Sequence, residues 1–207
     1  MKDLILLVAD LDTENVLLGL LPRLRQVCGT RDFTFEIKRH PYRDAGCLSG
    51  SVDFLRPFCN HFRHALVVFD KEGSGQERNQ REEIEAQLES DLTSNGWAEG
   101  NAKVIAINPE VENWMWINSP RISNALDWQE STPLFDWLKE QGWLEGGAEK
   151  PGRPKEAMVA VLKKTRKARS ASIYKNIASS TSFKGCTDEA FLKMLHTLKA
   201  WFMPEED

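Results

Sequence analysis

The sequence predicts an α/β fold in which a mainly parallel sheet is flanked by helices and followed by a C-terminal helical extension. Short apolar runs recur at residues 4–8, 65–69 and 104–107. Such uninterrupted runs are typical of strands that are buried on both faces of a parallel sheet. Segments with helical spacing of apolar residues separate these runs. The alternation of strand and helix favours right-handed crossovers, and active groups in such sheets lie beyond the carboxyl ends of the strands.

The first three elements after the opening strand are a helix, a strand and a second helix. A helix is expected over residues 16–27, where leucines recur on one face. Alternation of apolar and polar residues predicts a second strand at Phe33, Phe35 and Ile37. The next helix is expected to begin at Ser51, because apolar residues then recur at helical spacing at Leu55, Phe58, Cys59 and Phe62.

The run at residues 65–69 is the clearest strand in the chain, and it ends directly on Asp70. Beyond it, the residues from Ser74 to Glu77 have the pattern of a capping box, so a charged helix is expected to begin there. Its apolar stripe consists of Ile84, Leu88 and Leu92. The strand at residues 104–107 follows and runs into Glu110.

The second part of the chain is predicted to be a helical extension. Residues 145–154 read EGGAEKPGRP, a composition typical of a linker or an exposed loop. We therefore expect an α/β domain at residues 1–144 and a basic extension at residues 145–207, with helices at residues 155–167, 172–179 and 188–202. With 207 residues, the chain can form one sizeable core with an appendage, which argues against two independent enzymatic domains.

Neither export nor membrane insertion is expected. The apolar run at residues 4–9 is too short for a signal peptide or a bilayer span. The four cysteines lack the close pairs of a zinc ribbon and the density of a secreted disulfide scaffold. These observations predict a cytoplasmic protein without a membrane partner.

Acidic residues follow three of the predicted strands, in the pairs Asp10 and Asp12, Asp70 and Glu72, and Glu110 and Glu112. Carboxylates brought to one sheet edge repel one another unless a cation lies among them, and ligand sets made only of oxygen favour Mg²⁺ or Mn²⁺. The pattern therefore predicts a metal site. The alternative is that acids follow strands because loops are polar and because Asp caps helices well.

Several motifs of this chain resemble those of Toprim-like proteins. The segment ADLDTENVLLGLL is similar to their Val-Glu-Gly-x-Thr-Glu opening, with Asp10 at the position of the usual Glu. The segment FDKEGSG is similar to their second motif, Asp-x-Asp, and INPEVENWMW resembles the Asn-Pro-x-x-Glu-x-Trp signature of RloB-type relatives. With RDAGC, RPKEA and CTDEAF, these segments resemble the small Toprim-like protein of methylation-associated defence systems over nearly the whole chain.

This resemblance implies a Toprim-like fold and a place in a multi-component prokaryotic system against phage. It also implies that Asp10 takes part in acid-base chemistry and that Asp70 and Glu72 bind Mg²⁺. The chain departs from the family pattern at Asp10, which replaces Glu, at Leu11, which replaces Gly, and at Glu72, which replaces Asp. These departures leave metal binding as an expectation and bear on whether catalysis is retained.

The charge of the chain is distributed unevenly. Residues 1–144 contain 15 Lys and Arg against 23 Asp and Glu, a net charge of −8, whereas residues 145–207 contain 12 against 8, a net charge of +4. The most basic segment of the extension predicts contacts with nucleic-acid phosphates through Lys163, Lys164, Arg166, Lys167 and Arg169. The alternatives are a solvated helix face and a surface that binds an acidic partner protein. Trp114 and Trp116 are candidates for base stacking or for the core.

Two functions are compatible with these observations. The first is a Mg²⁺- or Mn²⁺-dependent Toprim-like nuclease that cleaves nucleic-acid phosphodiesters as a component of an antiviral defence system. The second is a catalytically degenerate Toprim-like module that binds nucleic acid or other proteins of the same system. The retained acids Asp70, Glu72, Glu110 and Glu112 favour the first, and the substitution at Asp10 favours the second. The chain has no Gly-x-x-x-x-Gly-Lys loop, so ATP hydrolysis is not expected.

Overall fold

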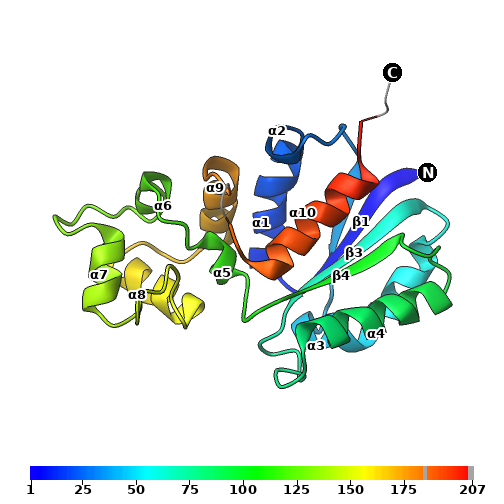
Figure 1. Cartoon of the computed structure of the whole chain (residues 1–207), viewed down its shortest axis with the longest axis horizontal. Helices are drawn as coiled ribbons and strands as arrows, with labels where there is room; N and C mark the ends of the chain where they lie inside the picture. Colours follow the sequence, from blue (N-terminus) through cyan, green and yellow to red (C-terminus); the bar gives the residue numbers. More distant parts are fainter. Residues whose placement is uncertain (184–185, 205–207) are drawn as a thin grey trace.

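The computed structural model describes residues 1–183 and 186–204, and it confirms an α/β fold with an all-parallel sheet. Among the described residues, four strands pair in the order β2-β1-β3-β4. Their bounds are β1 Lys2–Val8, β2 Phe35–Arg39, β3 Phe62–Asp70 and β4 Ala102–Ile107. Figure 1 shows this sheet between two layers of helices.

The sheet is covered on both faces because its central strands are apolar at every position of residues 4–8 in β1 and residues 65–69 in β3. Along β1, Leu4, Leu6 and Val8 belong to one buried cluster, and Ile5 and Leu7 belong to the other. The first cluster lies under α1 (Leu11–Leu20), the short α2 (Leu24–Cys28) and α10 (Glu189–Trp201). The second lies under α3 (Arg43–Leu55) and α4 (Arg81–Ser94) (Figure 1). Burial of apolar residues on both faces therefore stabilises a three-layer arrangement.

The outer edge of β4 is closed by side chains of α4. Glu85, which is 2% exposed, accepts a hydrogen bond from the backbone N–H of Ala106 at 2.9 Å, and Glu89 accepts one from Val104 at 3.1 Å. Lys193 of α10 pairs with both glutamates, at 3.0 and 2.6 Å. These contacts satisfy the N–H groups of an edge strand that would otherwise be open to pairing with another chain.

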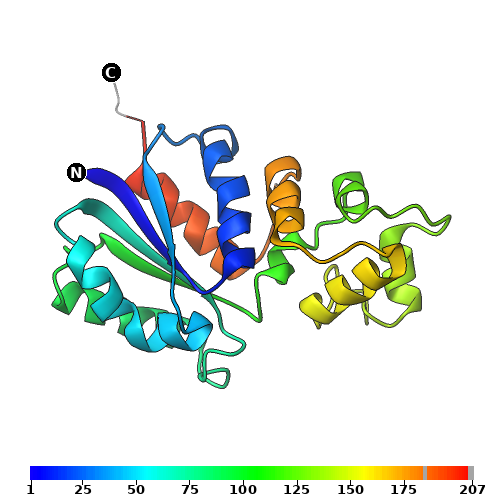
Figure 2. The same ribbon diagram turned by 180° about the vertical axis from the view of Figure 1, so that it is seen from behind.

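A separate group of helices lies beyond the carboxyl ends of the strands, as Figures 1 and 2 show from opposite sides. They are α5 (Glu112–Met115), α6 (Pro120–Ala125), α7 (Leu134–Glu140), α8 (Pro154–Thr165) and α9 (Ala171–Ser180). The helix α9 packs against α1, and Arg23 donates hydrogen bonds to the carbonyls of Ala178 and Thr181. The extension is thus attached to the N-terminal helix of the sheet domain.

The predicted boundary after residue 144 lies between α7 and α8. Residues of the extension nevertheless join the main core, since Phe191, Met194, Leu198 and Phe202 belong to the same cluster as β1. Residues 184–185 and 205–207 of the predicted extension lie outside the described residues.

The predicted starts of the two helices that flank β3 are wrong. The helix expected from Ser74 begins at Arg81, because the Glu77 carboxylate accepts hydrogen bonds from the N–H groups of Gly73 and Gly75 and holds this segment as a loop. The helix expected from Ser51 begins at Arg43. The sequence pattern did not predict its first turns because they contain Gly46 and Gly50, and glycine is a poor helix former. Both glycines lie against the ring of His40, which leaves no space for a larger side chain.

The helix expected over residues 16–27 is interrupted. Asp10 caps α1, so the helix begins at Leu11, and it ends at Leu20. Pro22 then lies in a 3₁₀ turn, η1 (Leu21–Arg23), because proline has no N–H for the helical ladder. A second 3₁₀ turn, η2 (Arg56–Phe58), follows α3.

Within residues 1–183 and 186–204, none of the helices has the length and apolar character needed to cross a membrane.

Replacing Gly19 by Ala tests the contact between α1 and α9. An added Cβ would lie 2.6 Å from the carbonyl oxygen of Lys175 and 2.9 Å from Cβ of Ala178. We expect this overpacking to lower the free energy of unfolding by about 1–3 kcal/mol, despite the higher helix propensity of Ala. Urea unfolding measures the change. The control is Gly152→Ala, where nothing lies within 4 Å, and an equal loss in both variants would contradict the prediction.

His64 predicts a pH dependence of stability. Its ring stacks on Trp201 at 4.4 Å, and burial lowers its pKa from 6.5 to about 4. Between these values the unfolded chain takes up a proton that the folded protein does not, so stability is lost as the pH falls through this window. We expect the difference in free energy of unfolding between the wild type and His64→Phe to change between about pH 7 and pH 4. A constant difference would show that burial of His64 has no such effect.

Candidate metal centre

Three carboxylates meet where β3 and β4 end. Asp70 is the last residue of β3, and Glu110 and Glu112 follow β4 after the cis peptide bond between Asn108 and Pro109. One oxygen from each of these three acids lies within 4.8 Å of the other two. Because β3 and β4 are parallel, their carboxyl ends lie at the same edge of the sheet, as the sequence predicts.

Each member of this acidic triad is buried and oriented by the protein. Asp70 is 6%, Glu110 6% and Glu112 1% exposed. Asp70 Oδ1 accepts the N–H of Val111 at 2.9 Å, and Glu110 Oε1 accepts the N–H of Lys155 at 2.8 Å. The hydroxyl of Tyr174 donates to Glu112 Oε1 at 2.7 Å. These hydrogen bonds hold one oxygen of each carboxylate and so set its direction.

Asp44 adds a further carboxylate that sequence analysis did not select. Its Oδ1 accepts the backbone N–H of Asp70 at 2.8 Å, which fixes the start of α3 against the end of β3. The sequence prediction assigned no helix or strand to residue 44 and began the next helix at Ser51, so the periodicity offered no reason to choose it. The segment RDAGC, which contains Asp44, was the available signal.

Burial and mutual repulsion raise the pKa values of this group. Desolvation, followed by the charges of Asp44, Glu112 and Asp10, holds the pKa of Asp70 well above its usual range. Burial also raises the pKa of Glu112, although the hydrogen bond from Tyr174 opposes it. The folded protein therefore carries an electrostatic cost when these acids are ionised, and a bound cation would remove it.

Two cations of the extension contact the acids. Lys155 Nζ lies 3.3 Å from Glu110 Oε2, and Arg169 Nη2 lies 2.7 Å from Asp12 Oδ2 and 3.4 Å from Glu112 Oε1. Burial lowers the pKa of Lys155, but the charges of Glu112, Glu110 and Asp70 outweigh it and raise the pKa above the usual value. Lys155 was not chosen as a site residue from the sequence, although it lies in the segment RPKEA.

The remaining acids of the sequence prediction lie around the triad. Asp10 Oδ1 accepts a hydrogen bond from the N–H of Thr13 at 2.9 Å, as expected of a helix cap. The charge of Asp10 also raises the pKa values of Asp70 and Asp44. Asp12 pairs with Arg169. Glu72 is exposed and lines a cavity of about 390 Å³ that Glu110 also lines. The structure thus brings together Asp70, Glu110 and Glu112, and leaves Asp10 and Glu72 outside this triad.

The triad fits a divalent ion. Glu112 Oε2 is buried without a hydrogen-bond partner, and a buried carboxylate oxygen of this kind calls for a ligand. Among the described residues, two cations contact the acidic group, and they are Lys155 and Arg169. The group has six carboxylates, those of Asp10, Asp12, Asp44, Asp70, Glu110 and Glu112. The three oxygens lie within 4.8 Å of one another, close to the spacing of an octahedral Mg²⁺ site, in which cis oxygens are about 3 Å apart and trans oxygens about 4.2 Å apart.

The predicted nucleic-acid contacts of the basic segment divide into two groups. Lys164 pairs with Glu130 at 3.4 Å, Lys167 pairs with Asp127 at 2.6 Å, and Arg169 reaches the acidic group. Lys163 and Arg166 are exposed and have no ion pair within the described part of the chain. Three of the five cations are therefore engaged within the protein.

Comparison with family models, with curated proteins and with solved structures gives no match. The assignment of function therefore depends on the side chains of this site.

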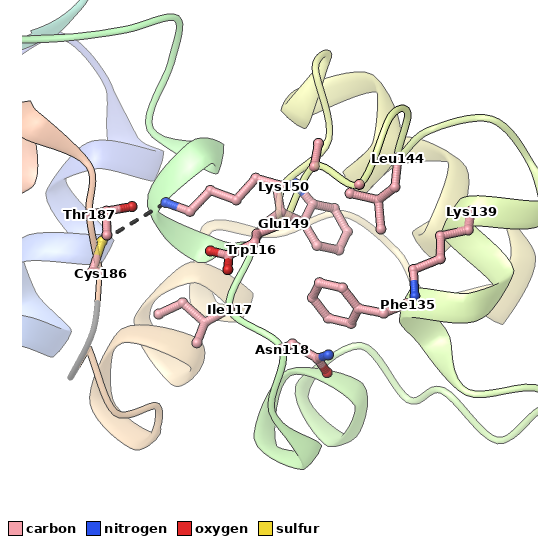
Figure 3. Close-up of a pocket in the computed structure, with 12 residues that line it drawn as sticks. Trp116, Ile117, Asn118, Phe135, Lys139, Leu144, Glu149, Lys150, Cys186 and Thr187 are labelled. Carbon is pink, nitrogen blue, oxygen red and sulfur yellow. Dashed lines mark hydrogen bonds between the residues drawn. The ribbon is translucent and has the colours of Figure 1, made fainter.

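A second cavity, of about 430 Å³, lies apart from the acids between α7, the loop before α8 and the segment before α10 (Figure 3). Trp116 and Phe135 line it, and Lys150 Nζ lies 3.9 Å from Cys186 Sγ. Trp116 is 1% exposed and donates its indole N–H to the carbonyl of Pro154. Trp114 is fully buried and donates to Asp188. The interpretation of these tryptophans as stacking platforms is therefore wrong, because both are core residues.

Substitution of Glu112 by Gln tests the metal site. Gln keeps an acceptor for Tyr174 but removes one charge and the free carboxylate oxygen. We expect the affinity for Mn²⁺, measured by calorimetric titration, to fall more than about tenfold.

The matched control is Glu72→Gln, which removes the same charge from an exposed position outside the triad. We expect it to leave the Mn²⁺ affinity unchanged. An equal loss in both variants would mean that Mn²⁺ responds to overall charge and not to this triad.

Proposed function

We propose that this chain is a Mg²⁺- or Mn²⁺-dependent phosphodiesterase that cleaves nucleic acid. The observation that supports this most directly is the buried triad of Asp70, Glu110 and Glu112 with the unpartnered Glu112 Oε2, bordered by Lys155 and Arg169. Carboxylates alone would repel a phosphodiester. A divalent ion held by the triad reverses the local charge, and the two neighbouring cations extend the positive region.

Each of these residues has a part in the proposed reaction. A bound divalent ion would polarise the phosphoryl group and stabilise the leaving oxygen. Asp70, Glu110 and Glu112 hold that ion. Lys155 and Arg169 release their carboxylate partners and bind the non-bridging phosphate oxygens. Asp10, whose Oδ1 caps α1, has Oδ2 to accept a proton from the attacking water.

The biological setting of the proposal comes from the sequence motifs. The segments RDAGC, FDKEGSG and RPKEA resemble the small Toprim-like protein of methylation-associated defence systems. They contribute Asp44, Asp70 and Lys155, three residues that contact one another or the triad. We therefore propose a role in prokaryotic antiviral defence, with nucleic acid and other proteins of that system as partners.

The proposed compartment is the cytoplasm. All four cysteines are free, as expected in a reducing environment, and they are Cys28, Cys47, Cys59 and Cys186.

A second candidate is a Toprim-like module that binds nucleic acid or partner proteins without cleaving. The observation in its favour is the position of Arg169, which occupies both Asp12 and Glu112 and lies where a phosphate would approach the triad. The Oδ1 of Asp10 is also committed to a helix cap. In this alternative the divalent ion organises the binding surface only.

The substitution Asp70→Asn separates the two candidates. Asn preserves the acceptor for the N–H of Val111, so the fold should be retained, but it removes a charge from the triad. For the enzyme, we expect cleavage of single-stranded DNA or RNA oligonucleotides by the wild type with Mg²⁺ or Mn²⁺ and a loss of more than about a hundredfold in the variant. The measurement is product formation resolved by gel electrophoresis.

A chelator should stop the wild-type reaction, and added Mn²⁺ should restore it. If the wild type binds the oligonucleotides in a metal-dependent manner without cutting either type, the binding module is the correct assignment. Cleavage that is unchanged in Asp70→Asn would place the active site elsewhere.

A further inference from the structure

A third cavity, different from the two described above, adjoins the metal centre on the side of β1 and β2. It has a volume of about 590 Å³ and is lined by the ends of these strands and the beginnings of α1 and α3. Arg43 lines this cavity, and the next residue, Asp44, accepts the backbone N–H of Asp70, so the cavity lies beside the acidic group. We call it the β2 groove, and its charged and titratable lining residues are Asp10, Glu14, Lys38, Arg39, His40 and Arg43.

The β2 groove has the opposite charge balance to the hollow on the other side of the triad. It contains three cations, Lys38, Arg39 and Arg43, against two acids, Asp10 and Glu14. The cavity of about 390 Å³ beside Glu72 is lined by two cations, Arg153 and Lys155. It is also lined by three acids, Glu72, Glu110 and Glu156. A polyanion that occupies the metal centre would therefore extend into the β2 groove.

The cations of the β2 groove are available to an external anion. Arg43 is exposed and has no ion pair within the described residues. Lys38 lies 3.5 Å from Glu36 Oε2, and Arg39 lies 3.0 Å from Glu14 Oε2. These side chains are 44% and 54% exposed. The pair of Lys38 is solvent-exposed and contributes little to stability, so its exchange for a phosphate is easy. Arg39 contacts Glu14, which is 23% exposed, through Nε, so its two Nη groups remain for a phosphate.

The position of Arg43 also links the groove to the metal centre. Arg43 has a φ of 50°, in the left-handed region that bulky residues seldom adopt. The next residue, Asp44, accepts the backbone N–H of Asp70. The chain thus turns so that consecutive residues serve the two sites, Asp44 inward to the triad and Arg43 outward to the groove.

We propose that the β2 groove binds a backbone phosphate of the nucleic-acid strand next to the phosphodiester held at the metal centre. This inference rests on the proposed function, because the strand is the substrate or ligand of that site. Lys38, Arg39 and Arg43 supply charge-assisted hydrogen bonds to the phosphate oxygens. His40 forms part of the floor: its ring is buried against Gly46, and its Nδ1 accepts the N–H of Tyr42 at 3.2 Å.

The double substitution Lys38→Gln and Arg43→Gln tests the proposal. Binding of a fluorescent single-stranded oligonucleotide is measured at several salt concentrations with Ca²⁺ in place of Mg²⁺, and cleavage is measured separately with Mg²⁺ or Mn²⁺. We expect the affinity at low salt to fall about tenfold and the slope of log K against log salt to become shallower by about 0.7 per lost contact. Mn²⁺ affinity should not fall.

The control is the double substitution Arg56→Gln and Arg63→Gln. It removes the same charge from exposed positions near the start of β3, at the opposite edge of the sheet from Asp70. We expect it to leave both the affinity and the slope unchanged. Equal weakening in the two double variants would overturn the groove, because binding would then follow overall charge.

The readouts distinguish failure of the groove from failure of the proposed function. A wild type that cleaves, together with a groove variant that binds and cleaves normally, overturns the groove and leaves the function in place. If the wild type binds without cleaving and only the groove variant binds more weakly, the phosphate site in the β2 groove is supported and the proposed phosphodiesterase activity is contradicted. A wild type that neither binds nor cleaves overturns both.

Discussion

The repulsion among carboxylates at the carboxyl edge of the sheet is the constraint on which the rest of the structure depends. Parallel pairing of β1, β3 and β4 brings acids that are distant in the sequence to the same place. The apolar core beneath Asp70 raises its pKa, because water cannot screen the charge there. This edge therefore needs positive charge to offset the repulsion, and Lys155 and Arg169 of the extension supply it by pairing with Glu110 and Asp12.

The extension can place these cations because other contacts fix it to the sheet domain. On one side, α9 lies against α1, where Gly19 allows a close approach to the carbonyl of Lys175. On the other side, Lys193 of α10 pairs with Glu85 and Glu89, the two residues that close the edge of β4. Tyr174 and Lys155 then reach the triad from α9 and α8. Packing and charge neutralisation support each other in this arrangement.

The same arrangement explains how the site would respond to a ligand. Lys155 and Arg169 are charged groups that neutralise the acids without filling the position next to Glu112 Oε2. A divalent ion placed there provides stronger neutralisation and leaves both cations able to contact a phosphate. The raised pKa of Asp70 and Glu112 makes ion binding and proton release linked events.

The sequence by itself determined the sheet and part of the site. Uninterrupted apolar runs identify strands buried on both faces, and acids that directly follow parallel strands meet at one edge, which was enough to predict that Asp70, Glu110 and Glu112 gather there. Only the tertiary structure decided that Glu72 stays exposed and outside the triad, because the side-chain alternation of a strand does not continue into a loop. The tertiary structure also determined that Asp44, Lys155 and Arg169 contact the acidic group. These residues reach the acids from α3, α8 and the loop before α9, and no local pattern encodes contacts between segments so far apart in the chain.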